Sequence, residues 1–134
     1  IIHAAVGKND GEVELNMAQD GARSTTNSIY WIYANKPTAI VKVPQITLDS
    51  LVQKHRLNRI DWLKLDVEGA EYDAFLGAEK AIEITRRIYL EVHYKRLEEE
   101  IKKILYRSGF VEAVEMFRLN EERAWLYFDK GDSP

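Results

Sequence analysis

Carboxylates gather at the end of a short apolar run near the middle of the chain. The stretch DWLKLDVEGAEYDAFLGAEKAI carries Asp66, Glu68 and Glu71 directly after residues that read as a buried strand. The next apolar run, RIYLEVH, ends in Glu91 and His93. Carboxylates can accept protons or bind a hard divalent cation, and the near-neutral pKa of histidine makes His93 the best general-base candidate in the chain. The pattern predicts a polar cluster of Asp66, Glu68, Glu91 and His93 around a ligand pocket.

Each of these residues also has a purely structural interpretation. Asp66 or Glu68 could cap the following helix, where an acidic group offsets unpaired amides and the helix dipole. Glu91 could pair with Lys64, and His93 could be a hydrogen-bonded structural residue. Spacing alone leaves both interpretations open.

The elements that position these residues follow from the spacing of apolar side chains. Apolar runs and alternation predict strands over residues 1–6, 13–17, 60–66, 87–93, 110–117 and 124–129. The run Trp62, Leu63, Leu65 and Val67 places strand 60–66 in the interior. Within residues 29–46, Pro44 restricts any strand to a sheet edge or a strand end. Helical spacing predicts helices after Thr47, from Tyr72 to Ala78, and from Leu97 to near Gly109.

Strands alternate with helices until the last two strands, which are joined by the short turn RLNEER. This turn is too short for a crossover helix, so the final pair must be antiparallel. The order predicts an open α/β sheet whose last strand is reversed. Ligands of such sheets bind beyond the carboxyl ends of the parallel strands, where Asp66, Glu91 and His93 would lie on neighbouring strands.

Composition limits the classes of function. A chain of 134 residues with 46% hydrophobic residues can form a single domain, and its net charge of -3 argues against a surface for nucleic acid or an anionic membrane. The absence of cysteine excludes disulfides and thiolate metal sites. No signal-like start or membrane-spanning run is present, so we expect a soluble, cytoplasmic protein. Because Ile1 already stands in a strand-like run, we expect further residues upstream.

Other candidate sites are weaker. The chain has no glycine-rich phosphate loop, nucleophile elbow or His-Glu-x-x-His pair, and the hydroxyls of residues 24–28 have no accompanying base. His3 and His55 have no partners in the pattern, and we interpret both as structural. The aromatic residues Tyr30, Trp31 and Tyr33 could line an acceptor pocket, but edge packing or an association surface is the preferred interpretation.

The segments ITLDSL, RIDWLKLDVEGAEYDAFLGAEKAI and IYLEVH follow one another along the chain, and HAAVGKNDGEVEL precedes them. In this set, which covers nearly the whole chain, the sequence resembles the FkbM family of S-adenosylmethionine-dependent methyltransferases. The matching residues are Thr47, Leu48, Asp49, Lys64, Asp66, Val67, Glu68, Gly69, Ala70, Glu71, Leu76, Gly77, Ala78, Glu91 and His93.

This resemblance implies a Rossmann-like class I methyltransferase sheet, mostly parallel, with an antiparallel carboxyl-terminal hairpin. It implies O-methylation of a hydroxyl on a small molecule, sugar or glycan, with S-adenosylmethionine as the cofactor. Asp66 would lie where donor and acceptor meet, flanked by Glu91 and His93, and His93 or Asp66 would remove the hydroxyl proton. Ala5 and Val6 would border the adenine.

In the same scheme Lys64 and Glu68 would contact the substrate. The family's glycine-bearing donor loop and its ribose-binding acid would lie upstream of Ile1, so residues 1–134 would form the carboxyl-terminal portion of the domain, without its amino-terminal strands. An exposed sheet edge could then favour a homo-oligomer.

Two alternatives to such an enzyme stay open. A non-catalytic binding or assembly module could retain the second half of the fold. A metal-assisted enzyme could instead use Asp66 and Glu91, although methyl transfer itself does not require a divalent metal.

Overall fold

The computed structural model describes residues 1–18, 26–30 and 37–131. Its strands are β1 (Ala5–Val6), β2 (Gly11–Met17), β3 (Ala39–Ile46), β4 (Ile60–Leu65), β5 (Thr85–Val92), β6 (Val111–Arg118) and β7 (Ala124–Asp129). Its helices are α1 (Leu48–His55), α2 (Glu71–Leu76), α3 (Glu79–Glu83) and α4 (Lys95–Arg107). The alternation of strands and helices confirms the predicted α/β class.

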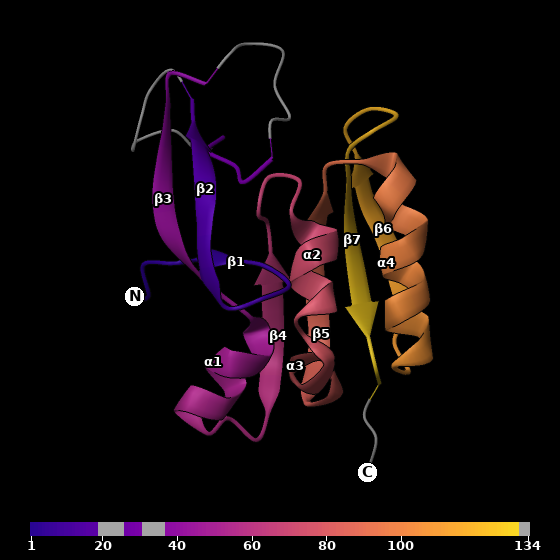
Figure 1. The fold of residues 1–134 in the computed structure, drawn as a ribbon. Helices are drawn as coiled ribbons and strands as arrows, with labels where there is room; N and C mark the ends of the chain where they lie inside the picture. The colour runs from indigo at the N-terminus through magenta and orange to yellow at the C-terminus, as the bar shows by residue number, and fades with distance from the viewer. Residues whose placement is uncertain (19–25, 31–36, 132–134) are drawn as a thin grey trace.

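The larger sheet has four strands in the order β4-β5-β7-β6 (Figure 1). β4 and β5 are parallel, whereas β7 is antiparallel to both β5 and β6. The predicted antiparallel final pair is therefore confirmed, and the reversed strand is β7. The parallel pairing places the carboxyl ends of β4 and β5 side by side.

A second sheet of three strands, in the order β1-β3-β2, corrects the prediction of one mostly parallel sheet. β3 is parallel to β1 but antiparallel to β2. The predicted strand over residues 1–6 was too long: Ile1 and Ile2 are exposed, and only two residues pair. Both sheets are therefore mixed.

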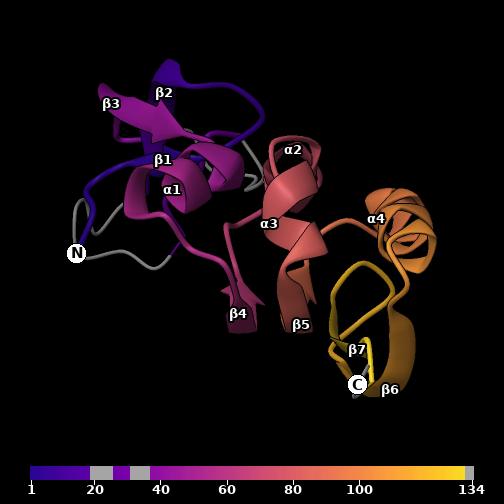
Figure 2. The same cartoon turned by 90° about the horizontal axis from the view of Figure 1, so that it is seen from below.

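The helices lie over one face of the four-stranded sheet, and the three-stranded sheet stands on the same side (Figure 2). Alternate residues of the strands point to this covered face, as Ile88, Leu90 and Val92 do in β5. The buried core consists of Leu48, Leu65, Ala74, Phe75, Ala78, Ala81, Ile82, Ile88, Leu90, Val92, Ile101, Leu105, Phe110, Ala124, Leu126 and Phe128.

Trp62 is exposed, so the expectation that strand 60–66 lies wholly in the interior is wrong at this residue. It is 59% exposed on the opposite face of the sheet, where it stacks on Tyr127 with ring centroids 5.7 Å apart. The guanidinium of Arg87 lies 5.5 Å from its ring. Successive residues of a strand point to opposite faces of the sheet, so Leu63 and Leu65 of β4 face the helices and Trp62 faces away from them. Because the described helices cover only one face, Trp62 is exposed.

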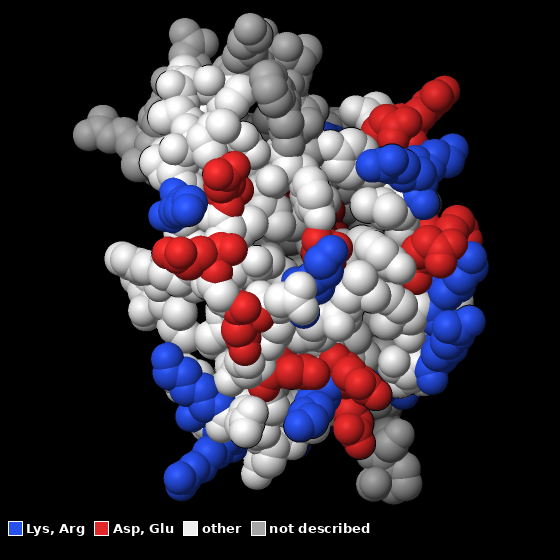
Figure 3. All heavy atoms as spheres, in the orientation of Figure 1, with Lys and Arg blue, Asp and Glu red and all other residues white. Residues whose placement is uncertain are grey.

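The surface carries acidic and basic groups interspersed over the face shown in Figure 3. None of the helices in the described segments is long and apolar enough to cross a membrane.

Two short helices replace the single helix predicted around Tyr72 to Ala78. The break falls at Gly77, which is the C-cap of α2, and the next residue, Ala78, is the N-cap of α3. Asp49 of α1 holds this break: its amide donates to the carbonyl of Gly77 at 3.1 Å, and its carboxylate accepts from the amide of Ala81 at 2.9 Å. Thr47, after which a helix was predicted, caps α1 by accepting a hydrogen bond from the Ser50 amide. The helix layer is thereby joined to the end of β3.

Gly77 also determines how closely β1 approaches the helices. A Cβ atom at this position would lie 2.6 Å from the carbonyl oxygen of Gly7, just after β1, and 3.0 Å from Cγ2 of Thr47. Because this oxygen of Gly7 belongs to the backbone, it cannot move aside as the end of a flexible side chain could. The small sheet and the helix layer meet at this glycine.

We expect Gly77→Ala to lower the free energy of unfolding by about 1–3 kcal/mol, because the added methyl group overpacks this junction. Urea unfolding followed by circular dichroism measures the change. The control is Leu76→Ala, one residue earlier and 50% exposed, which should change the stability by no more than about 0.5 kcal/mol. Equal stability of Gly77→Ala and the wild type would show that the junction is loosely packed.

Candidate active site

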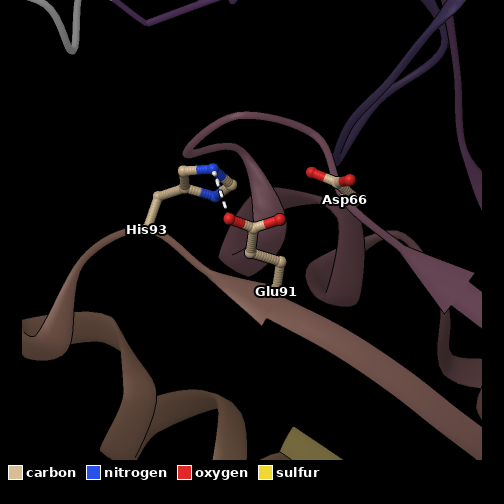
Figure 4. Close-up of side chains that lie close together, drawn as sticks. All are labelled: Asp66, Glu91 and His93. Carbon is tan, nitrogen blue, oxygen red and sulfur yellow. Dashed lines mark ion pairs between the residues drawn. The ribbon is translucent and has the colours of Figure 1, made fainter. Parts of the chain in front are cut away.

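The predicted cluster forms at the carboxyl ends of β4 and β5. Leu65 pairs with Leu90 in the parallel register, and Asp66 and Glu91 follow directly. His93 comes one residue after the end of β5, and its ring turns toward Glu91 and Asp66 (Figure 4). One ligand atom from each of these three side chains lies within 4.8 Å of the other two. The structure thus brings together the residues that the sequence placed at this edge.

His93 is the most buried member of the cluster, with only 2% of its side chain exposed. Its Nδ1 lies 2.8 Å from Oε1 of Glu71, and its Nε2 lies 3.1 Å from Oε2 of Glu68 and 3.5 Å from Oε1 of Glu91. Although these oxygens are close, Nε2 has no hydrogen-bond partner among the described residues. One side of the ring is hydrogen-bonded and the other faces carboxylates.

Glu71 belongs to the centre, although its place in the sequence did not predict a role there. Its side chain is 1% exposed, and its Oε1 accepts a hydrogen bond from the Gly69 amide at 2.9 Å as well as contacting His93. Side chains in the first turn of a helix point back toward its amino terminus, and this direction carries Glu71 under the preceding turn. That directional rule is the signal that could have identified it.

The turn between Asp66 and Glu71 is held in an unusual backbone conformation. Glu68 has φ 51° and Gly69 has φ 96°, both in the left-handed region. A non-glycine residue there costs about 1–3 kcal/mol. The turn is supported by Glu71 at Gly69 and by the Ser28 hydroxyl, which donates to the carbonyl of Glu68 at 2.5 Å. This conformation directs Glu68 toward His93.

The charges around His93 control its protonation. Burial lowers the pKa of His93, but the hydrogen bond to Glu71 and the charges of Glu71, Glu68 and Glu91 outweigh burial and raise the pKa above its ordinary value. Protonation of His93 therefore stabilises the fold at pH values below the unfolded pKa of 6.5. This contribution is lost as the pH rises through the higher folded pKa.

Helix capping by Asp66 or Glu68 and a Lys64–Glu91 pair are not what the structure shows, whereas His93 is hydrogen-bonded to Glu71 as its structural interpretation expects. The residue that caps α2 is Ala70, and no side chain caps that helix, so neither Asp66 nor Glu68 serves as its cap. Lys64 lies 3.1 Å from Asp66 and pairs with it instead of with Glu91. His3 and His55 are exposed and stand outside the cluster. The cluster is therefore not explained by helix capping.

A cleft of about 250 Å³ adjoins the cluster between the two sheets. Ala5 and Val6, predicted to border an adenine, line it together with Asp66 and Glu68. The full lining is Ala4, Ala5, Val6, Leu15, Asn27, Ser28, Ile29, Asp66, Val67, Glu68 and Ala70. Its walls are mostly apolar, with polar groups at the ends of the strands.

A second cleft, of about 310 Å³, borders the turn at Gly69 and is lined by Tyr30, Gly69, Tyr72, Asp73, Tyr94, Arg96 and Leu97. Tyr30 donates a hydrogen bond to Asp73, and burial, this hydrogen bond and the charge of Asp73 raise the pKa of Tyr30 to about 12. Trp31 and Tyr33, predicted with Tyr30, lie outside the described residues. Tyr30 thus faces a cleft and does not simply pack on a sheet edge.

Glu71→Gln should lower the pKa of His93, because the substitution removes the charge next to the protonated ring. NMR titration of the ring protons in the presence of EDTA measures this pKa. The matched control is Glu79→Gln, an exposed glutamate in α3, which should leave the His93 pKa unchanged. An unchanged pKa in Glu71→Gln would contradict the assignment of Glu71 as the main partner of the ring.

The chain is similar to known proteins over most of its length. Residues 1–124 match the Methyltransferase FkbM domain. Over an alignment of 70 positions the chain is 40% identical to the AMB antimetabolite synthetase AmbE of Pseudomonas aeruginosa, and the match covers 47% of this chain but 3% of that protein. No solved structure matches the chain significantly. With the family match spanning nearly all of the described strands and the whole cluster, the chain belongs to the FkbM methyltransferase domain family.

Proposed function

We propose that this chain carries the catalytic centre of an S-adenosylmethionine-dependent O-methyltransferase that acts on a hydroxyl of a small molecule or glycan. The observation that carries the proposal is the position of Asp66. It lies at the carboxyl end of a parallel strand, on the wall of the cleft beside Ala5 and Val6 and next to the Glu91–His93 pair. One residue thereby borders both a cavity for a donor and a group of proton acceptors.

The cleft fits part of the donor by its chemistry. Ala5, Val6 and Leu15 offer an apolar wall to a planar base, and Asn27 and Ser28 offer polar groups at the same cavity. When bound, S-adenosylmethionine supplies an electrophilic methyl group on a positively charged sulfur. Asp66 and Glu68 place negative charge at this end of the cleft, which favours a cation there.

Asp66, not His93, is the residue that meets the acceptor hydroxyl. The side chain of Asp66 is 29% exposed, whereas that of His93 is 2% exposed and closed in by glutamates. A general base must come within hydrogen-bond reach of the proton it removes. Asp66 therefore takes the hydroxyl proton as the oxygen gains the methyl group, and His93 stays hydrogen-bonded to Glu71.

The second cleft supports a hydroxyl-bearing acceptor. Tyr30, Tyr72 and Tyr94 line this cleft with aromatic rings on which the C–H face of a sugar or a flat aromatic ring can stack, and Gly69 connects this wall to the turn of the cluster. Arg96 lies 5.4 Å from the ring of Tyr94 and adds a positive charge at the rim. An acceptor bound here would reach the cluster past the turn at Gly69.

Asp66→Asn should lower the rate of methyl transfer about 10²–10⁴-fold, because an amide cannot take the proton. Transfer of a labelled methyl group from S-adenosylmethionine to a panel of sugars and phenols measures the rate. The control is Asp61→Asn, at the opposite end of β4, where Asp61 pairs with Arg59 on the surface.

Both variants should unfold at wild-type denaturant concentrations. If Asp66→Asn transferred methyl groups as fast as Asp61→Asn, Asp66 would not be the base. If the wild-type chain transferred no methyl group to any acceptor of the panel, the proposed activity itself would fail.

A further inference from the structure

We propose that Asp66, Glu91 and His93 form a binding site for one divalent transition-metal ion. The proposal rests on the arrangement of their side chains and does not depend on methyl transfer. One potential ligand atom from each residue lies within 4.8 Å of the other two, a spacing that one ion can bridge (Figure 4). All three come from the adjacent ends of two parallel strands, which is a rigid support.

Carboxylates that lie close together are not by themselves evidence of a metal site. The buried Nε2 atom of His93 is the observation that points to one. This nitrogen is buried, faces Glu91 and Glu68 at 3.5 and 3.1 Å, and has no hydrogen-bond partner among the described residues. A buried nitrogen without a partner is costly unless something occupies it. A metal ion between Nε2 and the carboxylates would satisfy it.

Glu71 determines which nitrogen of the His93 ring carries the hydrogen. A carboxylate only accepts hydrogen bonds, so the 2.8 Å contact requires that Nδ1 of His93 carries the hydrogen. A neutral ring then has its lone pair on Nε2, which lies 3.1 Å from Oε2 of Glu68 and 3.5 Å from Oε1 of Glu91. A carboxylate that fixes the far nitrogen of a histidine ligand is a common outer partner in metal sites.

The ligand chemistry selects the class of ion. Two carboxylate oxygens with one imidazole nitrogen suit Mn²⁺, Fe²⁺ or Zn²⁺ better than Mg²⁺ or Ca²⁺, which prefer oxygen ligands alone. Glu68 adds a further negative charge beside Nε2. Lys64 lies 3.1 Å from Asp66, but its side chain is 64% exposed, so it can turn into solvent when a cation binds.

Mn²⁺ titration of the 134-residue chain, with free Mn²⁺ followed by electron paramagnetic resonance, tests the site. We expect one tightly bound ion per chain. Glu71→Gln should raise the dissociation constant about 10–100-fold, as loss of an outer partner does, and Asp66→Asn and Glu91→Gln should raise it at least as much. Asp61→Asn, on the surface at the other end of β4, should bind Mn²⁺ like the wild type.

Equal affinity of the wild type and Glu91→Gln would overturn the proposal and indicate non-specific binding to surface carboxylates. A second measurement needs no variant: bound Mn²⁺ should broaden the ring resonances of His93 and leave those of His55, at the end of α1, sharp. Sharp His93 resonances at saturating Mn²⁺ would also overturn it. Because neither measurement uses the methyl donor, the metal site and the proposed activity can fail separately.

Discussion

The buried carboxylate of Glu71 is the interaction on which the centre depends. One of its oxygens holds both the Gly69 amide and the His93 ring, so it links the turn after β4 to the end of β5. A buried charge is tolerated only when it is well paired. The Gly69 amide and the His93 ring supply that pairing for Glu71. The same bond supports the left-handed backbone of Glu68 and Gly69. The Glu71 carboxylate therefore helps to fix the position of the His93 ring, to raise the pKa of that ring and to hold the backbone of the turn.

The rest of the fold brings a cleft to this centre. The three-stranded sheet carries Ala5 and Val6, whereas the four-stranded sheet carries Asp66, so the cleft exists only because the two sheets are held together. Gly77 permits the close approach of the Gly7 backbone, and Asp49 binds the two helices that meet at Gly77. Several residues that carry the family resemblance thus stabilise this junction and are remote from the proton chemistry.

The sequence predicted the features that depend on local order along the chain. Parallel strands separated by short helices must end at the same edge, so the meeting of Asp66, Glu91 and His93 followed from the spacing of two apolar runs. The antiparallel final pair followed from the length of one turn. The division into two sheets, the exposure of Trp62 and the break at Gly77 could not be predicted, because they depend on which faces other segments cover. The role of Glu71 was missed for a related reason: its side chain points back along the chain, and its partner is 22 residues away.

The central claim is that the cleft between the sheets and the cluster at its end form one site for methyl transfer. NMR titration of the isotope-labelled chain with S-adenosylhomocysteine tests this claim most directly, since it reports which backbone amides contact the ligand. The account predicts saturable shifts with a single dissociation constant at Ala5, Val6, Asn27, Ser28 and residues 66–70. Saturable shifts confined to other parts of the chain, or no shifts at all, would contradict it.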